Sequence, residues 1–292
     1  SPSVLHAGDR LGPYRLVHRV ALGGMAEVWA AREGERDLAL KVMRSAFADE
    51  DELHTMFEDE VQISRLLRHE NIVEVYGGEA IEGYLVQVME LIEGMDLRKV
   101  NRRLEQRRWR FPIPLAAYVA RCMARALGYA HKKRGPRGRP LDLVHRDVSP
   151  HNVMLGRDGR VKLLDFGIAK AEERATQTAA GLVKGKTAYM APEQATNRPL
   201  DHRTDIFATG IVLWECLAGR RLFQAGSDVG TMEQIVRGEV PELEAFRADV
   251  PSELSELIRS MLAVDPERRP GSMLDVERGV QRMIVRRFEP EQ

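Results

Sequence analysis

The stretch His145-Arg146-Asp147-Val148-Ser149-Pro150-His151-Asn152 is followed, thirteen residues after Asn152, by Asp165-Phe166-Gly167. Two carboxylates and one amide therefore stand at fixed separations along the chain. Carboxylate and amide oxygens are suitable ligands for Mg²⁺, and a carboxylate can also orient a hydroxyl group that attacks a phosphate. Phosphoryl transfer requires groups of these types at a fixed separation.

Further motifs lie on both sides of this stretch. Lys41 stands in Ala39-Leu40-Lys41-Val42, and Ala191-Pro192-Glu193 follows the second motif. With these, the chain resembles a eukaryotic-type (Hanks-type) Ser/Thr protein kinase of the bacterial branch, over roughly residues 14 to 280. The resemblance implies an α+β, two-lobed protein kinase fold, with a β-rich N-lobe that carries one key helix and a larger α-helical C-lobe.

Hydrophobic periodicity divides the chain in the same way. Period-two alternation predicts strands, and steps of three and four residues predict helices. The expected strands are 14–20, 28–31, 38–42, 72–76 and 84–89, and the clearest expected helices are 52–67, 116–131, 204–217, 232–236 and 254–262. We expect one kinase domain over 1–292, with an N-lobe at about 10–91, a hinge at about 90–94 and a C-lobe at about 95–285.

Composition excludes several classes of protein. The 292 residues carry 44 basic and 44 acidic side chains, so net charge favours neither a nucleic-acid partner nor membrane contact by this segment. Cys122 and Cys216 are too few for a disulfide framework, and we expect both to be buried thiols in a reducing compartment. With no leader visible, the segment is expected to be cytoplasmic, either alone or as the kinase domain of a longer, membrane-anchored protein.

Lys41 is the first candidate ligand for phosphate. It shares a strand face with Ala39, because side chains alternate along a strand. A Lys at such a position faces inward only if an acidic partner holds it, and Glu60 on the following helix is the natural partner. The resemblance implies that the Lys41–Glu60 pair is needed for activity and that Lys41 contacts the α- and β-phosphates of ATP.

The remaining ATP-binding residues are assigned by resemblance. Ala21-Leu22-Gly23-Gly24-Met25-Ala26-Glu27-Val28 occupies the place of the glycine-rich loop, with Ala21 and Ala26 where the family has glycine. Because each Ala adds a methyl group, we expect a stiffer loop and weaker ATP binding, not its loss. Ala39 and Met89 would line the adenine pocket, and the backbones of Glu90 and Ile92 would bind the base.

The resemblance also assigns the catalytic roles. Asp147 is the base that orients the substrate hydroxyl, and Asn152 and Asp165 hold Mg²⁺ (or Mn²⁺). Arg146 would bind a phosphorylated residue of the activation segment, the stretch between Asp165 and Glu193, and Thr176 and Thr178 are the candidates. Glu193 and Arg269 are expected to be structural, because the family pairs the corresponding residues with each other.

Three activities are compatible with these motifs. The leading hypothesis is a kinase for Ser and Thr of proteins, itself included, with a homodimer as the arrangement for trans-autophosphorylation. One rival is a nucleotide-binding pseudokinase or signalling scaffold, which the altered glycine loop favours and the presence of Lys41, Glu60, Asp147, Asn152 and Asp165 opposes. The other is a small-molecule phosphotransferase, which the intact Ala191-Pro192-Glu193 opposes.

Two departures from the family pattern belong together. Ser149 stands two residues after Asp147, where these kinases have a Lys, and Lys186 stands three residues before Tyr189, where they have a Thr. The hydroxyl and the cation have exchanged positions, so we hypothesise that Lys186 reaches Asp147 and the γ-phosphate while Ser149 supplies a hydrogen bond.

Lys186→Ala should therefore reduce turnover much more than the loss of a solvated Lys would, because a cation next to the transferred phosphate is removed. Steady-state kinetics of the variant measure this effect. Unchanged turnover would refute the exchange.

Overall fold

A computed structural model describes residues 4–22, 26–44, 50–166 and 187–288 of the chain. These residues divide into two compact units. The first contains the described residues up to Glu93 together with Phe166, and the second contains those from Gly94 to Asp165 and from Thr187 onward.

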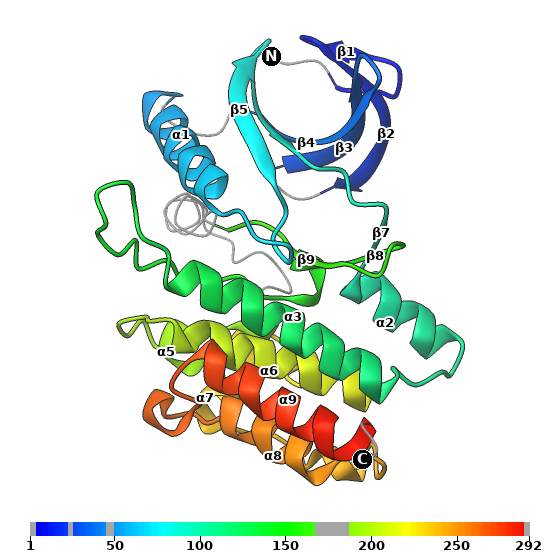
Figure 1. Cartoon of the computed structure of the whole chain (residues 1–292), viewed down its shortest axis with the longest axis vertical. Coiled ribbons are helices and arrows are strands. Elements are labelled where there is room, and N and C mark those ends of the chain that lie inside the picture. Colours follow the sequence, from blue (N-terminus) through cyan, green and yellow to red (C-terminus); the bar gives the residue numbers. More distant parts are fainter. Residues whose placement is uncertain (1–3, 23–25, 45–49, 167–186, 289–292) are drawn as a thin grey trace. The chain divides into compact units, whose positions relative to one another are not determined.

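The first unit is built on an antiparallel sheet of six strands in the order β1-β2-β3-β4-β6-β5, which curls on itself (Figure 1). Its strands are β1 (Arg10–Leu11), β2 (Tyr14–Leu22), β3 (Ala26–Glu33), β4 (Arg36–Arg44), β5 (Val75–Ile81) and β6 (Tyr84–Met89). Strands that follow each other directly in the chain pair as hairpins, the arrangement that short connections favour. Only β4 and β5 are separated, by a helix.

The side chains of β4 alternate between two environments. Leu38, Leu40 and Val42 are buried in the apolar cluster of the sheet, where each aliphatic side chain contributes about 1.5–3 kcal/mol. Ala39 and Lys41 belong to the opposite face. The register is fixed by this burial, because a shift of one residue would place Lys41 in the apolar cluster.

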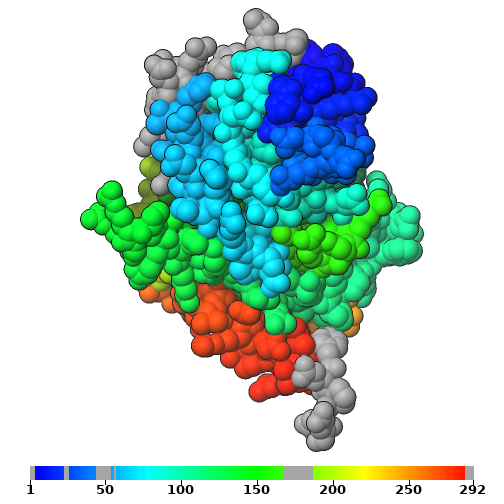
Figure 2. All heavy atoms as spheres, turned by 45° about the horizontal axis from the view of Figure 1, so that its top comes forward, coloured from blue at the N-terminus to red at the C-terminus, as the bar shows by residue number. Residues whose placement is uncertain are grey.

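Helix α1 (Glu50–Leu66) packs against β5 and β6. Phe57 and Val61 form a buried cluster with Leu85 of β6, and the partly buried Met43 of β4 packs against it. Both views show α1 alongside β5 (Figures 1 and 2). Since Met43 and Lys41 share a face of β4, α1 covers the face from which Lys41 projects.

The second unit is mainly helical. Its α-helices are α2 (Leu97–Gln106), α3 (Ile113–His131), α5 (Pro192–Ala195), α6 (Arg203–Ala218), α7 (Asp228–Arg237), α8 (Ser252–Met261) and α9 (Met273–Phe288). Every residue of α6 from Thr204 to Leu217 is buried, as expected of a helix that other elements surround. Helices α3 and α8 pack against α6, and α9 packs against both of them (Figure 1).

Three expectations from the sequence need correction. The strand expected at 72–76 is wrong, because β5 begins at Val75 and continues through Gly77 and Gly78, which carry no apolar signal. Helices α2, α5 and α9 were not among the expected helices, and α2 has Leu97 as its only buried residue. The sheet β7-β8-β9 was also missed, because its strands are only three or four residues long.

Two expectations about the chain as a whole can be compared with the described residues. Cys122 and Cys216 are both buried, as expected, and burial raises the pKa of the Cys216 thiol to about 12. Within the described ranges, no helix is both long enough and apolar enough to span a membrane.

An ion pair between Arg269 and Glu193 joins distant parts of the second unit. Arg269 donates to both carboxylate oxygens of Glu193, at 2.7 and 2.8 Å, and the side chains of both residues are almost fully buried. The other N–H groups of Arg269 bind the backbone carbonyls of Ala263, Val264 and Arg203, at 2.8 to 3.1 Å. All five guanidinium donors are therefore used, and the expected pair is present.

The carboxyl of Glu193 stays ionised inside this network. Burial by itself would raise its pKa, but the hydrogen bonds from Arg269 and from Thr204 Oγ1 reverse the effect, so that the pKa lies below its usual value. A carboxylate with two strong donors can tolerate burial because its charge is compensated.

Gly78→Ala should destabilise the first unit by about 1–3 kcal/mol, the usual cost of overpacking. A Cβ atom at position 78 would lie 2.6 Å from Val61 and 2.8 Å from Phe57, so α1 would have to move away from β5. Chemical unfolding measures the change in free energy. Gly77→Ala is the matched control, because a Cβ atom there meets nothing within 4 Å; equal destabilisation by the two variants would contradict this account.

Arg269→Lys should lower the free energy of unfolding by about 2–4 kcal/mol, because three ammonium donors cannot replace five and buried acceptors lose their partners. The same substitution at the exposed neighbour, Arg268→Lys, should have no measurable effect. Urea denaturation of both variants tests the difference. Stability of Arg269→Lys equal to that of Arg268→Lys would show that charge alone, without the planar geometry, is sufficient.

Candidate active site

A hairpin explains the separation between the two motifs of the second unit. Strand β8 (Val153–Gly156) begins directly after Asn152, and β9 (Val161–Leu163) ends one residue before Leu164. Arg157-Asp158-Gly159 forms the turn, which the Gly156 N–H closes by donating to the carbonyl of Arg160 at 2.8 Å, and Gly159 has a φ of 83° that glycine adopts without strain. Leu164 N–H donates to the carbonyl of Asn152 at 2.8 Å. The hairpin thus returns the chain so that Asp165 follows a residue bonded to Asn152.

The amide of Asn152 is bound to Asp147. Its Nδ2 donates to the backbone carbonyl of Asp147 at 2.8 Å and to the Oδ2 atom of its carboxylate at 3.1 Å. Two oxygen acceptors fix which end of the amide carries the nitrogen, so Oδ1 points elsewhere. This clamp limits the rotation of the Asp147 carboxylate and leaves an amide oxygen available.

His145 connects the two motifs. Its Nδ1 accepts from the N–H of Asp147 at 3.2 Å, and its Nε2 lies 2.7 Å from the carbonyl of Leu164. Since one ring nitrogen accepts, the network assigns the proton to Nε2, which donates to Leu164. The ring is fully buried and therefore acts as a spacer between Asp147 and the residue before Asp165.

Asp205 anchors the segment from His145 to Asn152, called the catalytic loop below, a role that the sequence did not predict. Its fully buried carboxylate accepts the N–H groups of His145 and Arg146, at 2.8 and 2.9 Å, and lies 2.7 Å from His131 Nε2. Arg146 has a φ of 65°, an unusual value for a non-glycine residue, and these bonds hold it there. The only signal in the sequence was a carboxylate at the start of an apolar helix.

The carboxyl of Asp205 is ionised in spite of its burial. Burial would raise its pKa, but the hydrogen bonds from the His131 side chain and from the backbone N–H of His145 lower the pKa below its ordinary value. A buried carboxylate with three donors is a rigid support. The catalytic loop is also held from the other side, where Gln194 Nε2 donates to the carbonyl of Arg146 at 3.1 Å.

Lys41 and Glu60 are both buried in the first unit, with 7% and 8% of their surface exposed. Lys41 projects from the face of β4 that α1 covers, and Glu60 lies on the same face of α1 as Phe57 and Ser64, at helical steps of three and four. The cost of burying an ammonium and a carboxylate is lowest when they are paired. Their mutual pairing remains a prediction.

Two of the residues predicted to bind adenine are neighbours on adjacent strands of the first unit. Ala39 and Met89 are buried and are direct partners in the β4–β6 ladder. The N–H of Glu90 donates to the carbonyl of Glu74 at 2.9 Å, and its carboxylate accepts from the N–H of Glu74 at 2.9 Å. Because its N–H is used, the backbone group with which Glu90 could bind adenine is its carbonyl.

The glycine-rich loop is described only at its two ends. Ala21 and Leu22 end β2, where they pair with Val28 and Glu27 of β3. Ala26, Glu27 and Val28 are half-buried. The loop residues Gly23, Gly24 and Met25 lie outside the described residues.

Several other predicted residues also lie outside the described ranges, namely Thr176, Thr178 and Lys186. Ser149, the proposed partner of Lys186 in the exchange, is buried, with 5% of its surface exposed, and its carbonyl accepts the N–H of Asn152 at 3.0 Å. The exchange therefore stays a hypothesis.

The predicted metal ligands fit Mg²⁺ by their chemistry. Asn152 offers an amide oxygen and Asp165 a carboxylate, and Mg²⁺ is usually held by one or two such groups together with phosphates and water. The described residues contain no cluster of three or more His, Cys, Asp or Glu side chains arranged to hold a metal.

Three curated relatives match most of this chain. A tyrosine-protein kinase of Myxococcus xanthus, MasK, is 39% identical over 88% of the chain. The serine/threonine-protein kinases PrkC of Bacillus subtilis and PknA of Mycobacterium tuberculosis are 32% and 34% identical over 92% and 88% of it. The chain spans only 41%, 40% and 58% of the lengths of these three proteins.

The fold has a solved counterpart in the PknI kinase domain of Mycobacterium tuberculosis. The match has a TM-score of 0.71 at 26% identity and covers 96% of this chain and 99% of that one. The family model described as a protein kinase domain matches residues 14–279. With the clamp on Asp147, the hairpin that leads to Asp165 and the sheet that carries Lys41, the chain belongs to the protein kinase family and has the protein kinase fold.

Proposed function

We propose that this chain is the catalytic domain of an ATP- and Mg²⁺-dependent protein kinase that phosphorylates Ser and Thr residues of proteins, including its own activation segment. The observation that carries the proposal is the clamp of Asn152 on Asp147. It fixes a carboxylate in a loop that is itself held by Asp205, as positioning of an acceptor hydroxyl requires.

Each residue has a definite task in this reaction. Asp147 accepts a hydrogen bond from the substrate hydroxyl, aims it at the γ-phosphate and takes up its proton. Asn152 and Asp165 would hold Mg²⁺, which supplies compensation for the charge of the phosphates. Lys41, kept inward by Glu60, would bind the α- and β-phosphates. Catalysis by these groups is chiefly positioning and charge stabilisation.

Family membership supports the use of ATP, and the relatives support the choice of acceptor. PrkC and PknA are named as serine/threonine kinases, whereas MasK is named as a tyrosine kinase. Tyr is therefore the second candidate acceptor, and mass spectrometry of the labelled protein distinguishes it from Ser and Thr. Ser149 stands where the family usually has a Lys, and this difference is also compatible with a preference for Tyr as acceptor.

Three other features are proposed with this function. The two compact units would be the lobes of one kinase domain, with the hinge at about 90–94. A homodimer would allow one copy to phosphorylate Thr176 or Thr178 of another, so the autophosphorylation rate per molecule should rise with protein concentration. A cytoplasmic location would give access to ATP.

Purified protein with Mg²⁺ and γ-labelled ATP should incorporate label on Thr176 or Thr178, as mapped by mass spectrometry. Asp147→Asn should reduce the incorporation at least about 100-fold, because loss of a general base costs that much or more. Asp142→Asn is the matched control. Asp142 is exposed and has a φ of 46°, which Asn tolerates, so this variant should keep its activity.

Three other outcomes would change the proposed function or its predicted sites. Label on Tyr alone would assign the chain to the tyrosine-specific class. Absence of label, with a melting temperature that still rises on addition of ATP, would indicate a nucleotide-binding pseudokinase. Labelled protein in which neither Thr176 nor Thr178 is modified would refute the predicted activation-segment sites but not the activity.

A further inference from the structure

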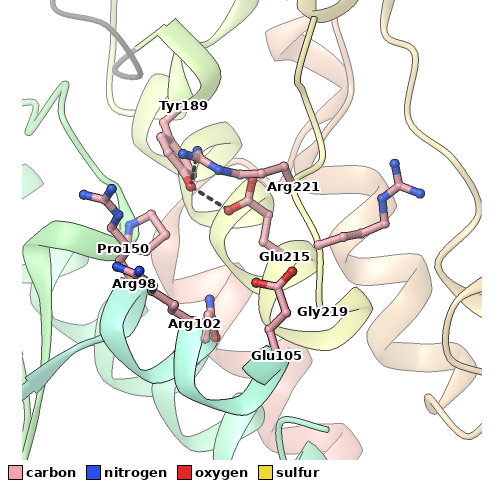
Figure 3. Close-up of a pocket in the computed structure, with 10 residues that line it drawn as sticks. Arg98, Arg102, Glu105, Pro150, Tyr189, Glu215, Gly219 and Arg221 are labelled. Atoms are coloured by element: carbon pink, nitrogen blue, oxygen red, sulfur yellow. Dashed lines mark hydrogen bonds between the residues drawn. The ribbon is translucent and has the colours of Figure 1, made fainter. Parts of the chain in front are cut away.

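The second unit contains a pocket of about 270 Å³ beside the catalytic loop (Figure 3). Four arginines line it, Arg98, Arg102, Arg220 and Arg221. Their concentration is unusual in a chain whose basic and acidic residues balance. We name this feature the arginine pocket.

Helix geometry accounts for one wall of the arginine pocket. The lining residues of α2 are Arg98, Asn101, Arg102 and Glu105, at positions i, i+3, i+4 and i+7, and hence on one helix face. The facing wall follows the end of α6, where Gly219 has a φ of 70° and ends the helix, so that Arg220 and Arg221 come next. The first wall is therefore fixed by a helix, and the second begins where the left-handed Gly219 ends α6.

The positive charge of the arginine pocket is not neutralised by ion pairs in the described part of the chain. Arg98 donates to His151 at 3.1 Å, Arg221 donates to the hydroxyl of Tyr189 at 2.8 Å, and Arg220 lies over the ring of Phe246. None of these contacts supplies a negative charge. Each guanidinium has five N–H donors, so most of them remain for a ligand.

The two carboxyl groups of the arginine pocket offset only part of this charge, because four guanidinium groups share the lining with two carboxyl groups, those of Glu105 and Glu215. Glu215 accepts from the Tyr189 hydroxyl at 2.6 Å and from the N–H of Leu222 at 3.1 Å, and burial raises its pKa (Figure 3). Glu105 is exposed and stands at the end of α2. The pKa of His151 is lowered by burial and then by the charge of Arg98, with Arg221 contributing, as expected beside a positive site.

The position of the arginine pocket relates it to the substrate. Pro150 lines it and lies three residues after Asp147, so the two Cα atoms are at most about 11 Å apart. An extended peptide advances about 3.3 Å per residue. A side chain within about four residues of an acceptor at Asp147 could therefore enter the pocket.

We propose that the arginine pocket binds an anionic side chain of the protein substrate, close in sequence to the phosphorylated residue. Guanidinium groups bind carboxylates and phosphoryl groups with paired hydrogen bonds, so both Glu or Asp and a phosphorylated residue fit. This inference rests on the proposed kinase function and specifies its substrate class as acidic sequences.

The test uses the full chain and peptides with one acceptor, in which Glu is placed in turn at each of the four positions on either side and Gln serves as reference. At one position or more, Glu should raise kcat/KM by about 5–20-fold over Gln, mainly through KM, and phosphoserine there shows which anion is preferred. The preference should shrink at high salt, since the pocket is open to solvent.

The double variant R98E/R102E should abolish this Glu/Gln ratio and favour Lys at the same position. A general loss of activity would lower kcat/KM for the Glu and Gln peptides equally, so it would not change their ratio. The control K99E/R103E changes the net charge equally, on the same helix and with the same spacing, but outside the arginine pocket, and should keep the ratio. Absence of any Glu preference, or a preference unaffected by R98E/R102E, would overturn the proposal.

A binding measurement separates this inference from the kinase function. Fluorescent peptides with Ala in place of the acceptor should bind about 5–20-fold more tightly with Glu than with Gln, even if no phosphate is transferred. Binding preference without transfer would leave the arginine pocket intact and refute the proposed activity. Phosphate transfer without a binding preference would support the proposed activity and refute anion binding by the arginine pocket.

Discussion

The buried carboxylate of Asp205 is the group on which the catalytic loop depends. It accepts two successive backbone N–H groups, of His145 and Arg146, and holds Arg146 in a left-handed conformation that costs about 1–2 kcal/mol in a non-glycine residue. The dependence is mutual. Asp205 could not remain ionised inside α6 without these donors and His131, and the loop could not keep its shape without Asp205.

From this anchor the geometry of the site extends in two steps. His145 bridges the N–H of Asp147 and the carbonyl of Leu164. The side chain of Asn152 binds Asp147, and the backbone carbonyl of Asn152 accepts the N–H of Leu164. The β8–β9 hairpin converts a separation of thirteen residues into adjacency. The spacing of the motifs is thus set by the length of this hairpin. Because the hairpin brings the two motifs together, their spacing predicts one site for phosphoryl transfer.

The arginine pocket shows how local charge can differ from net charge. The chain is neutral overall, so composition favours no anionic partner. Helix α2 nevertheless places two arginines on one face, and the turn after α6 brings two more, more than a hundred residues later in the sequence. Specificity for a substrate can therefore arise from packing that leaves the overall charge unchanged.

The sequence by itself determined the features that local patterns encode. Alternation placed Lys41 opposite Leu40, apolar periodicity predicted α1, α3 and α6, and the motifs assigned Asp147, Asn152 and Asp165 to one site. Only the tertiary structure decided which distant groups meet. Asp205 beneath the catalytic loop, and Arg98 facing Arg221, depend on contacts between segments far apart in the chain. Periodicity reports which side of an element is buried, but not what it is buried against, because that partner is set by the packing of whole elements.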